Sequence, residues 1–368
     1  MQRLESLDVF RGLTIAGMIL VSTPGTWDTV YSELEHAAWN GWTLADLVFP
    51  FLLFAMGAAV PFALARRRGT RSVRHHVIRR AAILFALGLL LNAIEAAPPL
   101  SLATFRIPGV LQRIALVYLA VSWLTERTST RTQIGVAIAA LLGYWAAIVF
   151  VPVPGCESPT MSAECNIGSF IDRHVFARHM AYGIWDPEGL LSTIPAVATA
   201  LFGVFAGDWL KEPGARHRTA TLFAAGAGAA LVALMWDRVF PINKNLWTSS
   251  FALFTAGLAA QVLAACHWLL DVQGWRTWSR PFVAFGRNPL AGYFLSVGGD
   301  SILTRWIVSV GTEYASSLKG FVYRVLFASW ATRCCGGETA SLAYALAYVA
   351  VWALVLGEMH RRRIYVGI

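Results

Sequence analysis

Long, uncharged, hydrophobic stretches recur along the whole chain and are separated by shorter polar segments. Most of them approach the ~20 residues that an α-helix, rising about 1.5 Å per residue, needs to cross about 30 Å of hydrocarbon. The pattern therefore predicts an all-α, polytopic membrane helix bundle that forms a single domain over residues 1–368. We expect about ten membrane spans, at residues 9–24, 44–65, 78–97, 108–125, 133–152, 189–208, 218–236, 248–270, 281–298 and 339–358.

The composition supports this fold class. Hydrophobic residues make up 57% of the chain and charged residues only 14%, with a mean hydropathy of +0.55. A soluble globular domain typically carries about 25% charged residues. These values exclude a soluble multidomain protein.

Basic residues give the chain a net charge of +9, but they are confined to short loops between apolar spans. This is the positive-inside pattern of membrane proteins, so no nucleic-acid partner is expected. The largest basic cluster lies in residues 65–80, and the smaller clusters fall on the same side of an alternating count. We therefore expect both termini on the cytoplasmic side. Asp8 and Arg11 interrupt the first apolar stretch, and no cleavage site follows it, which favours a retained span over a signal peptide.

Three longer loops, at about 25–43, 153–188 and 299–338, then lie on the outer side. This side is oxidising, so a disulfide between Cys156 and Cys165 is expected. The neighbouring pair Cys334 and Cys335 permits no such inference, because vicinal disulfides are strained. Residues 318–330 are short and contain Arg324, which favours an interfacial helix over another span.

The outer loop before the second span contains the first candidate for chemistry, in the segment LEHAAWNGWTLADLVFPF. The side chain of a histidine can exchange a proton near neutral pH, so His36 could take a proton from an amine that must become a nucleophile. Asp46 could orient the imidazole, or it could form a capping box with Thr43 at the start of the second span. An interfacial histidine that bonds only to backbone is the alternative interpretation of His36.

Two further outer segments carry polar residues that suit an amino sugar. In WDPEGLLSTIP, carboxylates of Asp186 and Glu188 could hold an ammonium group or hydroxyls, while Trp185 could stack on a sugar face. Asp186 followed by Pro187 also reads as an N-cap and first residue of a helix. In FPINKNLWTSSF, Asn243 and Lys244 are candidates for substrate binding, with a lysine beside an interfacial tryptophan belt as the simpler interpretation.

Polar residues inside the predicted spans indicate a functional cavity, because an unpaired charge in hydrocarbon costs several kcal/mol, about 2.5–3.5 on insertion scales. Gln112 and Arg113 lie within the fourth span, and Arg287 and Asn288 interrupt the ninth. Pro289 should break that helix and expose backbone groups, which are tolerated at depth only where they line a cavity. Asp8 and Arg11 are three residues apart in the first span and are expected to pair with each other.

Taken in order, six motifs resemble the bacterial relatives of heparan-α-glucosaminide N-acetyltransferase, a transmembrane acyltransferase. They are SLDVFRGLTIAGMILV, LEHAAWNGWTLADLVFPF, RIPGVLQRIALVY, WDPEGLLSTIP, FPINKNLWTSSFALFTAGLA and GRNPLAGY, and they extend to about residue 295.

The resemblance implies a multi-pass protein of the bacterial inner membrane that uses cytoplasmic acetyl-CoA as co-substrate to N-acetylate a glucosamine-type sugar on the other side. The histidine that this family is regarded as using for catalysis matches His36, and other motif residues match Asp46, Arg113 and Glu188. It also suggests a homodimer. One departure is the segment Ser22-Thr23-Pro24-Gly25, where relatives typically have Asn-Asn-Pro-Gly.

These observations predict a membrane N-acetyltransferase in which His36 deprotonates the sugar amine and Asp46 fixes the imidazole. Gln112 and Arg113 in the fourth span, with Arg287 and Asn288 in the ninth, are expected to hold the cofactor. An acetyl-histidine intermediate is a variant of the same hypothesis. The alternative is an amino-sugar transporter without acyl-transfer chemistry. A third is a non-catalytic membrane scaffold. No P-loop, GxSxG, HExxH or metal-spaced Cys/His group occurs, so no metal is implied.

Overall fold

The computed structural model describes residues 4–65, 72–96, 101–211, 215–309 and 315–366. Helices dominate the described residues, as predicted, and the chain divides into two compact units. The first unit comprises residues 1–37, 43–48 and 275–367, and the second comprises residues 38–42 and 49–274. The single predicted domain is thus built as two units, which are described separately.

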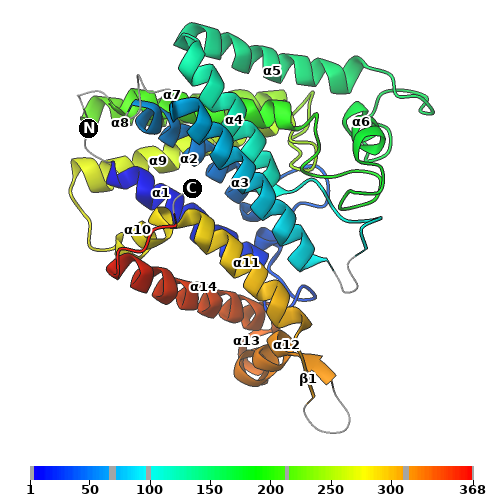
Figure 1. Cartoon of the computed structure of the whole chain (residues 1–368), viewed down its shortest axis with the longest axis vertical. Helices are drawn as coiled ribbons and strands as arrows, with labels where there is room; N and C mark the ends of the chain where they lie inside the picture. The colour runs from blue at the N-terminus through cyan, green and yellow to red at the C-terminus, as the bar shows by residue number, and fades with distance from the viewer. Residues whose placement is uncertain (1–3, 66–71, 97–100, 212–214, 310–314, 367–368) are drawn as a thin grey trace. The chain divides into compact units, whose positions relative to one another are not determined.

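The first unit is built on α1, whose neighbours are α10, α11 and α14 (Figure 1). Two glycines allow close packing, since a Cβ at Gly12 would overlap the carbonyl of Phe282, and one at Gly286 would overlap the carbonyl of Asp8. Its elements are α1 (Glu5–Ser22), a 3-10 turn (Ser32–Leu34), the start of α2 (Leu44–Ala65), α10 (Arg280–Arg287), α11 (Pro289–Arg305), β1 (Ile307–Ser309), β2 (Ala315–Ser317), α12 (Leu318–Tyr323), a π turn (Arg324–Ala328), α13 (Ser329–Cys335) and α14 (Gly337–Arg361).

The predicted helix break at Asn288-Pro289 is confirmed. Helix α10 ends at Arg287 and α11 begins at Pro289. At the first position of a helix the backbone N–H has no partner within the helix, so a proline, which lacks that N–H, is tolerated there. Asn288 is fully buried; its amide nitrogen donates to the carbonyl of Ile364 at 3.1 Å, and its amide oxygen accepts from Val366 N at 2.9 Å. The broken helix therefore holds a segment that follows α14.

The loop after α11 contains structure that the apolar pattern did not predict. Strands β1 and β2 form a short antiparallel hairpin in which Ile307 faces Ser317 and Ser309 faces Ala315. The fold is therefore helical with one small hairpin rather than strictly all-α. Residues 318–335 continue as α12, the π turn and α13, which confirms the helix predicted at 318–330 but extends it.

The second unit contains the rest of α2 and the helices up to residue 272. Helix α3 packs along α4 and α8 along α9 (Figure 1). Gly203 and Gly207 on α7 bring that helix close to α2, because a Cβ at either position would overlap α2 backbone. The elements are α3 (Ser72–Glu95), α4 (Val110–Arg127), α5 (Thr130–Phe150), α6 (Ile167–Phe176), α7 (Thr193–Lys211), α8 (Ala215–Trp236), α9 (Ser249–His267) and a π turn (Trp268–Val272).

Seven helices of the described chain are long and apolar enough to cross a membrane: α2, α3, α5, α7, α8, α9 with its π turn, and α14. They match seven of the ten predicted spans. The other three predictions fall on α1, on α4 and on the broken pair α10 and α11, which are helical but shorter or richer in charge.

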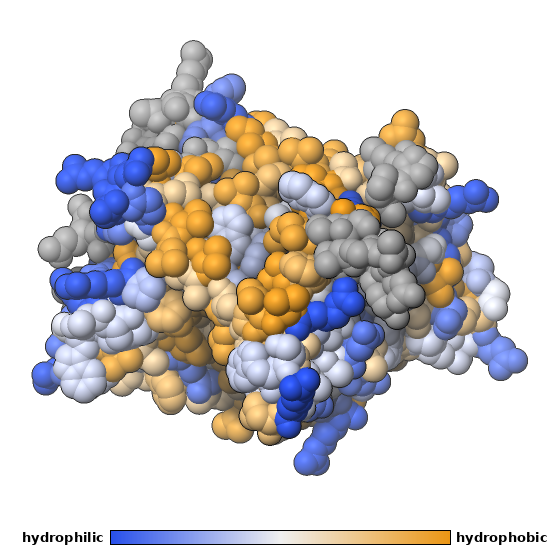
Figure 2. Space-filling view, turned by 90° about the horizontal axis from the view of Figure 1, so that it is seen from below, coloured by the Kyte–Doolittle hydropathy of each residue, from blue (hydrophilic) through white to orange (hydrophobic). Residues whose placement is uncertain are grey.

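Hydrophobic side chains also cover much of the outer surface, as expected where lipid is the solvent. Leu231 on α8 is 61% exposed and Leu354 on α14 is 75% exposed. Figure 2 shows hydrophobic residues exposed on one face beside hydrophilic ones. The number of spans and the side on which the termini lie stay predictions.

Two predictions about the loop at 153–188 have different outcomes. Cys156 and Cys165 form the expected disulfide. The helix predicted to start at Pro187 is wrong, because residues 187–192 form turns and α7 begins at Thr193. The carboxylate of Asp186 accepts from Glu188 N at 2.9 Å, a local turn that replaces the first helical turn.

Candidate active site

His36 and Asp46 lie next to each other in the first unit. The ring nitrogen Nδ1 of His36 and Oδ1 of Asp46 are 2.8 Å apart, although the residues are ten positions apart in the chain. The His36 side chain is 49% exposed, whereas the Asp46 side chain is completely buried. The pair therefore presents an imidazole to solvent on a fixed, buried carboxylate.

Asp46 is held by the helix start that the sequence predicted. Thr43 N and Thr43 Oγ1 donate to Asp46 Oδ2 at 3.0 and 3.2 Å, and Ala37 N donates to the same oxygen at 3.1 Å. The Thr43 side chain is also within 2.5 Å of the carbonyl of Glu35. Oδ2 of Asp46 thus caps α2 and binds the backbone of the segment 35–37, while Oδ1 orients His36. The contact with His36 and the capping contact with Thr43 are therefore both present, while a role of Asp46 in catalysis or in binding a sugar hydroxyl stays a prediction.

In the second unit, Asp186 and Glu188 share one guanidinium that the sequence analysis did not select. Arg106 Nε and Nη2 donate to the two oxygens of Asp186 at 2.9 and 2.7 Å, and Nη2 lies 2.5 Å from Glu188 Oε2. Burial lowers the pKa of Arg106, but the charges and hydrogen bonds of Glu188 and Asp186 outweigh it and raise this pKa above its ordinary value. Asp186 also accepts from Ala181 N at 2.8 Å, so its acceptors are well occupied.

The segment that carries Arg106 is anchored from both sides. The amide nitrogen of Asn92 donates to the carbonyls of Arg106 and Pro108, both at 2.9 Å. Gln112 Nε2 donates to Ile107 O at 3.0 Å, and Ile107 N donates to His179 O at 3.0 Å. Gln112 is therefore placed to shape the loop that positions Arg106.

A third carboxylate approaches the same turn from α6. Asp172 is 4% exposed, and its Oδ1 accepts from Leu190 N at 2.8 Å. The pKa of Asp172 is raised to about 6, mainly by burial. The backbone hydrogen bond from Leu190 lowers this pKa, and the nearby charge of Asp186 raises it further. The turn after Asp186 is thus surrounded by acidic groups.

Trp185 lies in a cluster of aromatic rings. Its ring stacks on Tyr182 with centroids 4.4 Å apart, and Trp39 meets it edge-on at 5.2 Å. Trp39 Nε1 donates to Met161 O at 2.8 Å. Trp39, Tyr182 and Trp185 thus form an aromatic cluster within the second unit.

Asn243 and Lys244 have different environments. Asn243 is fully buried; its Oδ1 accepts from Leu246 N at 2.9 Å and its Nδ2 donates to Asn40 Oδ1 at 3.1 Å. Its amide shapes the turn before α9, which begins after Thr248 as predicted. Lys244 is partly exposed.

Arg113 is almost completely buried, at 1% exposed. Its Nη2 donates to Gly189 O at 3.1 Å and lies 2.5 Å from Ser192 Oγ, and its guanidinium lies 5.0 Å from the centre of the Trp247 ring. Within the described part of the chain, Nε and Nη1 of Arg113 are buried without a hydrogen-bond partner. Two donors of a buried cation are therefore directed into the interior beside the Gly189 turn.

Arg287 lines a polar cavity of about 480 Å³ in the first unit. Its Nη1 donates to the hydroxyl of Tyr365 at 3.1 Å, and its Nε lies 4.0 Å from Asp8 Oδ2. The expected pairing of Asp8 with Arg11 is present at 3.7 Å. The cavity is lined by Glu5, Asp8, Arg280, Val283, Arg287 and His360.

The predicted residues thus fall into groups. In the first unit, His36 and Asp46 contact each other, and Arg287 and Asn288 lie with the C-terminal segment. In the second unit, Arg113 lies at the turn that follows Asp186 and Glu188. The main omission was Arg106. One signal pointed to it, because an arginine in a loop predicted to be outside runs against the positive-inside pattern and calls for an acidic partner.

The described residues therefore form a multi-pass helical membrane protein with a histidine–aspartate pair at the start of a membrane helix. The chain is 30% identical to heparan-alpha-glucosaminide N-acetyltransferase of Homo sapiens, in a match that covers 79% of this chain and 52% of the relative. It is 29% identical to the protein of the same name from Mus musculus, over 79% of this chain and 53% of the relative.

The chain spans about half the length of the curated relatives it matches. A family model described as a domain of unknown function (DUF5009) matches residues 3–155, which include His36, Asp46 and Arg113. The resemblance inferred from the six motifs is confirmed: the chain is similar to heparan-alpha-glucosaminide N-acetyltransferases over 79% of its length.

Proposed function

We propose that this protein is a transmembrane N-acetyltransferase. It moves an acetyl group from cytoplasmic acetyl-CoA to the amine of a glucosamine-type sugar on the extracytoplasmic side of a bacterial inner membrane. The names of the relatives support acetyl transfer to a glucosaminide, and the seven apolar helices support the membrane setting. The observation that carries the proposal is the His36–Asp46 pair.

The pair is suited to general base catalysis. When Nδ1 of His36 donates its proton to the buried carboxylate of Asp46, the lone pair of the imidazole is on Nε2. A half-exposed ring lets substrate reach that nitrogen. Asp46 is fixed by Thr43 and Ala37, so the imidazole keeps its orientation through the reaction.

The proposed step begins with the neutral sugar amine. Its nitrogen attacks the thioester carbon, and His36 Nε2 takes the proton that the nitrogen loses as the new C–N bond forms. The C–S bond then breaks, and the CoA thiolate leaves with the electron pair and takes up the proton from the imidazolium. The products are an N-acetyl sugar and free CoA thiol, with the histidine restored.

A variant of this mechanism acetylates His36 first. The thioester carbon would then form a bond to Nε2 while its C–S bond breaks and CoA leaves as the thiolate. In a second step the sugar amine would attack the acetyl carbon, the C–N bond to the imidazole would break, and the proton lost by the amine would go to the thiolate. Labelled acetyl-CoA mixed rapidly with protein in the absence of acceptor separates the two mechanisms. Direct transfer leaves no label on the protein, whereas the two-step mechanism leaves one label per active site.

We assign the nucleotide phosphates of the donor to the cavity at Arg280, Arg287 and His360. Its volume of about 480 Å³ and its three basic side chains support this assignment, although the carboxylates of Glu5 and Asp8 also line it. The positive-inside pattern predicts that the cavity faces the cytoplasm. Asn288 acts indirectly, since its amide holds the segment that carries Tyr365. We assign Arg113 to a carbonyl of the donor, because two of its donors are buried without a partner among the described residues. Gln112 positions the neighbouring loop.

For the acceptor sugar, we keep Trp185, Glu188 and Lys244 as binding residues. The aromatic cluster around Trp185 supports stacking on a sugar ring. We assign Asp186 and Asn243 to positioning, because hydrogen bonds inside the protein already occupy their polar atoms. The homodimer suggested by the resemblance stays a prediction.

The test uses the full-length protein purified in detergent with acetyl-CoA and glucosamine, and follows the release of CoA thiol. Wild-type protein should release thiol at a sustained rate only when the amine is present. His36→Ala should lower the rate about 10²–10⁴-fold, the usual contribution of a general base, without changing the melting temperature. The matched control is His174→Ala, which removes another exposed histidine of the outer region and should leave the rate unchanged.

Two outcomes would contradict the proposal. Wild-type protein that binds glucosamine but releases no thiol would support the transporter alternative. A His36→Ala variant that keeps the wild-type rate would remove His36 from catalysis while leaving acetyl transfer possible.

A further inference from the structure

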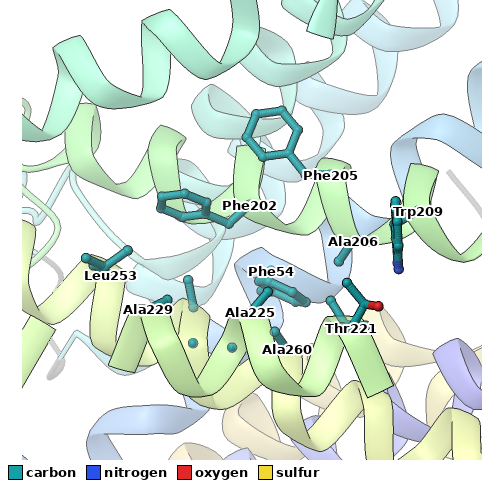
Figure 3. A pocket seen from close by; sticks show the side chains of 14 residues that line it. Phe54, Phe202, Phe205, Ala206, Trp209, Thr221, Ala225, Ala229, Leu253 and Ala260 are labelled. Carbon is teal, nitrogen blue, oxygen red and sulfur yellow. The ribbon is translucent and has the colours of Figure 1, made fainter. Parts of the chain in front are cut away.

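Four helices of the second unit surround an apolar pocket that the proposed acetyl transfer does not use. Its volume is about 310 Å³, at the small end of the range of ligand pockets (Figure 3). Helices α2, α7, α8 and α9 contribute its walls, and all four are long and apolar enough to cross a membrane. Because these helices lie in hydrocarbon, a hydrophobic molecule can enter the pocket from the bilayer.

The pocket exists because small side chains of α8 and α9 face large ones of α7. Gly226 and Gly257 let α8 and α9 approach closely, since a Cβ on either would come within 2.6 Å of the carbonyl oxygen of the other. Phe202, Phe205 and Trp209 of α7 form the opposite wall (Figure 3). The remaining lining residues are Phe54, Ala206, Thr221, Leu222, Ala225, Ala229, Leu253, Ala256 and Ala260.

The polar atoms of the lining side chains are occupied within the protein. The hydroxyl of Thr221 donates to His217 O at 2.9 Å, and Nε1 of Trp209 donates to Arg218 O at 3.1 Å. The described lining side chains therefore offer mainly hydrocarbon contact, which disfavours a water-soluble ligand.

The two ends of the pocket differ. Figure 3 shows Trp209 and Thr221 at one end and Leu253 and Ala229 at the other. At the Trp209 end, the guanidinium of Arg218 lies 4.6 Å from the centre of the Trp209 ring, and its Nη1 donates to Trp209 O at 2.8 Å. A tryptophan held against an arginine at the end of two membrane helices is typical of the headgroup level of a bilayer.

We propose that this pocket binds one acyl chain of an anionic phospholipid, whose phosphate lies beside Arg218. The occupant is argued from the apolar walls, from the membrane setting of all four helices, and from the cationic end. That end lies on the side predicted to face the cytoplasm, and Lys211 there is paired with Asp208 at 3.3 Å, which leaves Arg218 as the cation proposed to meet the phosphate. The pocket is too small to admit a helix of a second chain. The proposal does not depend on acetyl transfer.

The test measures lipid binding to the full-length, delipidated protein in detergent by native mass spectrometry. The probes are phosphatidylglycerol and phosphatidylcholine with the same acyl chains, and soluble glycerol phosphate serves as competitor. Wild-type protein should retain one phosphatidylglycerol at least tenfold more tightly than phosphatidylcholine, and glycerol phosphate should not displace it.

Two variants with matched controls locate the lipid. Ala225→Phe fills the pocket and should reduce binding of both lipids at least tenfold, whereas Leu231→Phe, on the lipid-exposed side of the same helix, should not. Arg218→Gln should remove the preference for phosphatidylglycerol, whereas Arg216→Gln should keep it. A melting curve checks that each variant is folded.

Three results would overturn the proposal. Unchanged lipid binding by folded Ala225→Phe would exclude the pocket. Equal affinity of the wild-type protein for the two lipids would exclude an anionic headgroup. Displacement by glycerol phosphate would show that a free phosphate site, rather than an acyl-chain pocket, holds the ligand.

Discussion

Two carboxylate sites of this protein are built from similar residues but use them differently. At the first, buried Asp46 binds a half-exposed histidine with one oxygen and a helix start with the other. At the second, Asp186 and Glu188 are both bound by Arg106. A carboxylate with a neutral partner can stabilise a proton gained by that partner, whereas a carboxylate paired with a permanent cation mainly fixes structure. We therefore expect the Asp46 site to take part in acetyl transfer, and the Arg106 site to hold the loop that shapes the binding of the acceptor sugar.

The largest effect is expected from Asp46→Asn. The variant keeps the shape of the side chain but loses the charge that stabilises protonated His36, so the acetyl-transfer rate should fall about 10²–10⁴-fold. The measurement is CoA thiol release with saturating glucosamine. Asp28→Asn, which changes an exposed carboxylate of the segment between α1 and α2, is the control. Full activity of Asp46→Asn would break the distinction drawn between the two sites.

A smaller effect, on stability rather than on chemistry, is expected from Arg106→Gln. It leaves two buried carboxylates without their cation, which should destabilise the fold by about 3–5 kcal/mol. Thermal unfolding in detergent measures the loss, and Arg178→Gln, at an exposed arginine of the neighbouring loop, is the control. Adding Glu188→Gln should restore part of the stability. A variant that melts like the wild type would show that Arg106 is no part of the framework.

The pH dependence of stability should change in Asp172→Asn by a still smaller amount. The pKa of Asp172 is about 6 in the folded protein and 3.8 ordinarily, so the folded state binds this proton more tightly. The stability that the protonated Asp172 contributes is fully present below about pH 4 and is lost as the pH rises through 6. Asp172→Asn should therefore raise stability at pH 7.5, by up to about 3 kcal/mol, with a smaller gain at pH 4.5.

Melting curves of wild type and Asp172→Asn at both pH values measure this difference. Glu157→Gln, at an exposed position of the same loop, should show no such dependence. An equal effect of Asp172→Asn at both pH values would contradict the assignment of the titration to Asp172.

The smallest effect is expected from Thr43→Ala. It removes the hydroxyl that contacts Glu35 O and Asp46, so about 1 kcal/mol of stability should be lost. Thr43→Ser keeps the hydroxyl and should behave like the wild type in the same melting experiment. A loss in Thr43→Ser equal to that in Thr43→Ala would mean that the methyl group, and not the hydroxyl, matters.

The features that could be predicted from sequence are those decided by neighbouring residues. Thr43 and Asp46 are three positions apart, so their capping interaction is visible as a motif. Pro289 cannot continue a helix, so the break before it follows from its chemistry. Cys156 and Cys165 close a short loop, which made their pairing foreseeable.

The features that were missed depend on residues far apart or on local competition. Arg106 is 80 residues from Asp186, and only the folded chain brings them together. The start of α7 was misplaced because the Asp186 side chain bonds to the backbone of Glu188, which favours a turn over a helix. The burial of the Arg113 charge could be anticipated from the sequence. Which of its donor atoms are without a hydrogen-bond partner among the described residues could not.

The side-chain amide of Asn288 cannot form its hydrogen bonds until late in the synthesis of the chain. Its partners, Ile364 and Val366, come 76 and 78 residues later in the chain. At about 5–20 residues per second, a ribosome needs on the order of 4–15 s to supply them. During that interval α10 and α11 have been synthesised, but their junction lacks these partners. The Tyr365 hydroxyl that accepts from Arg287 is likewise added only after α14 has been synthesised.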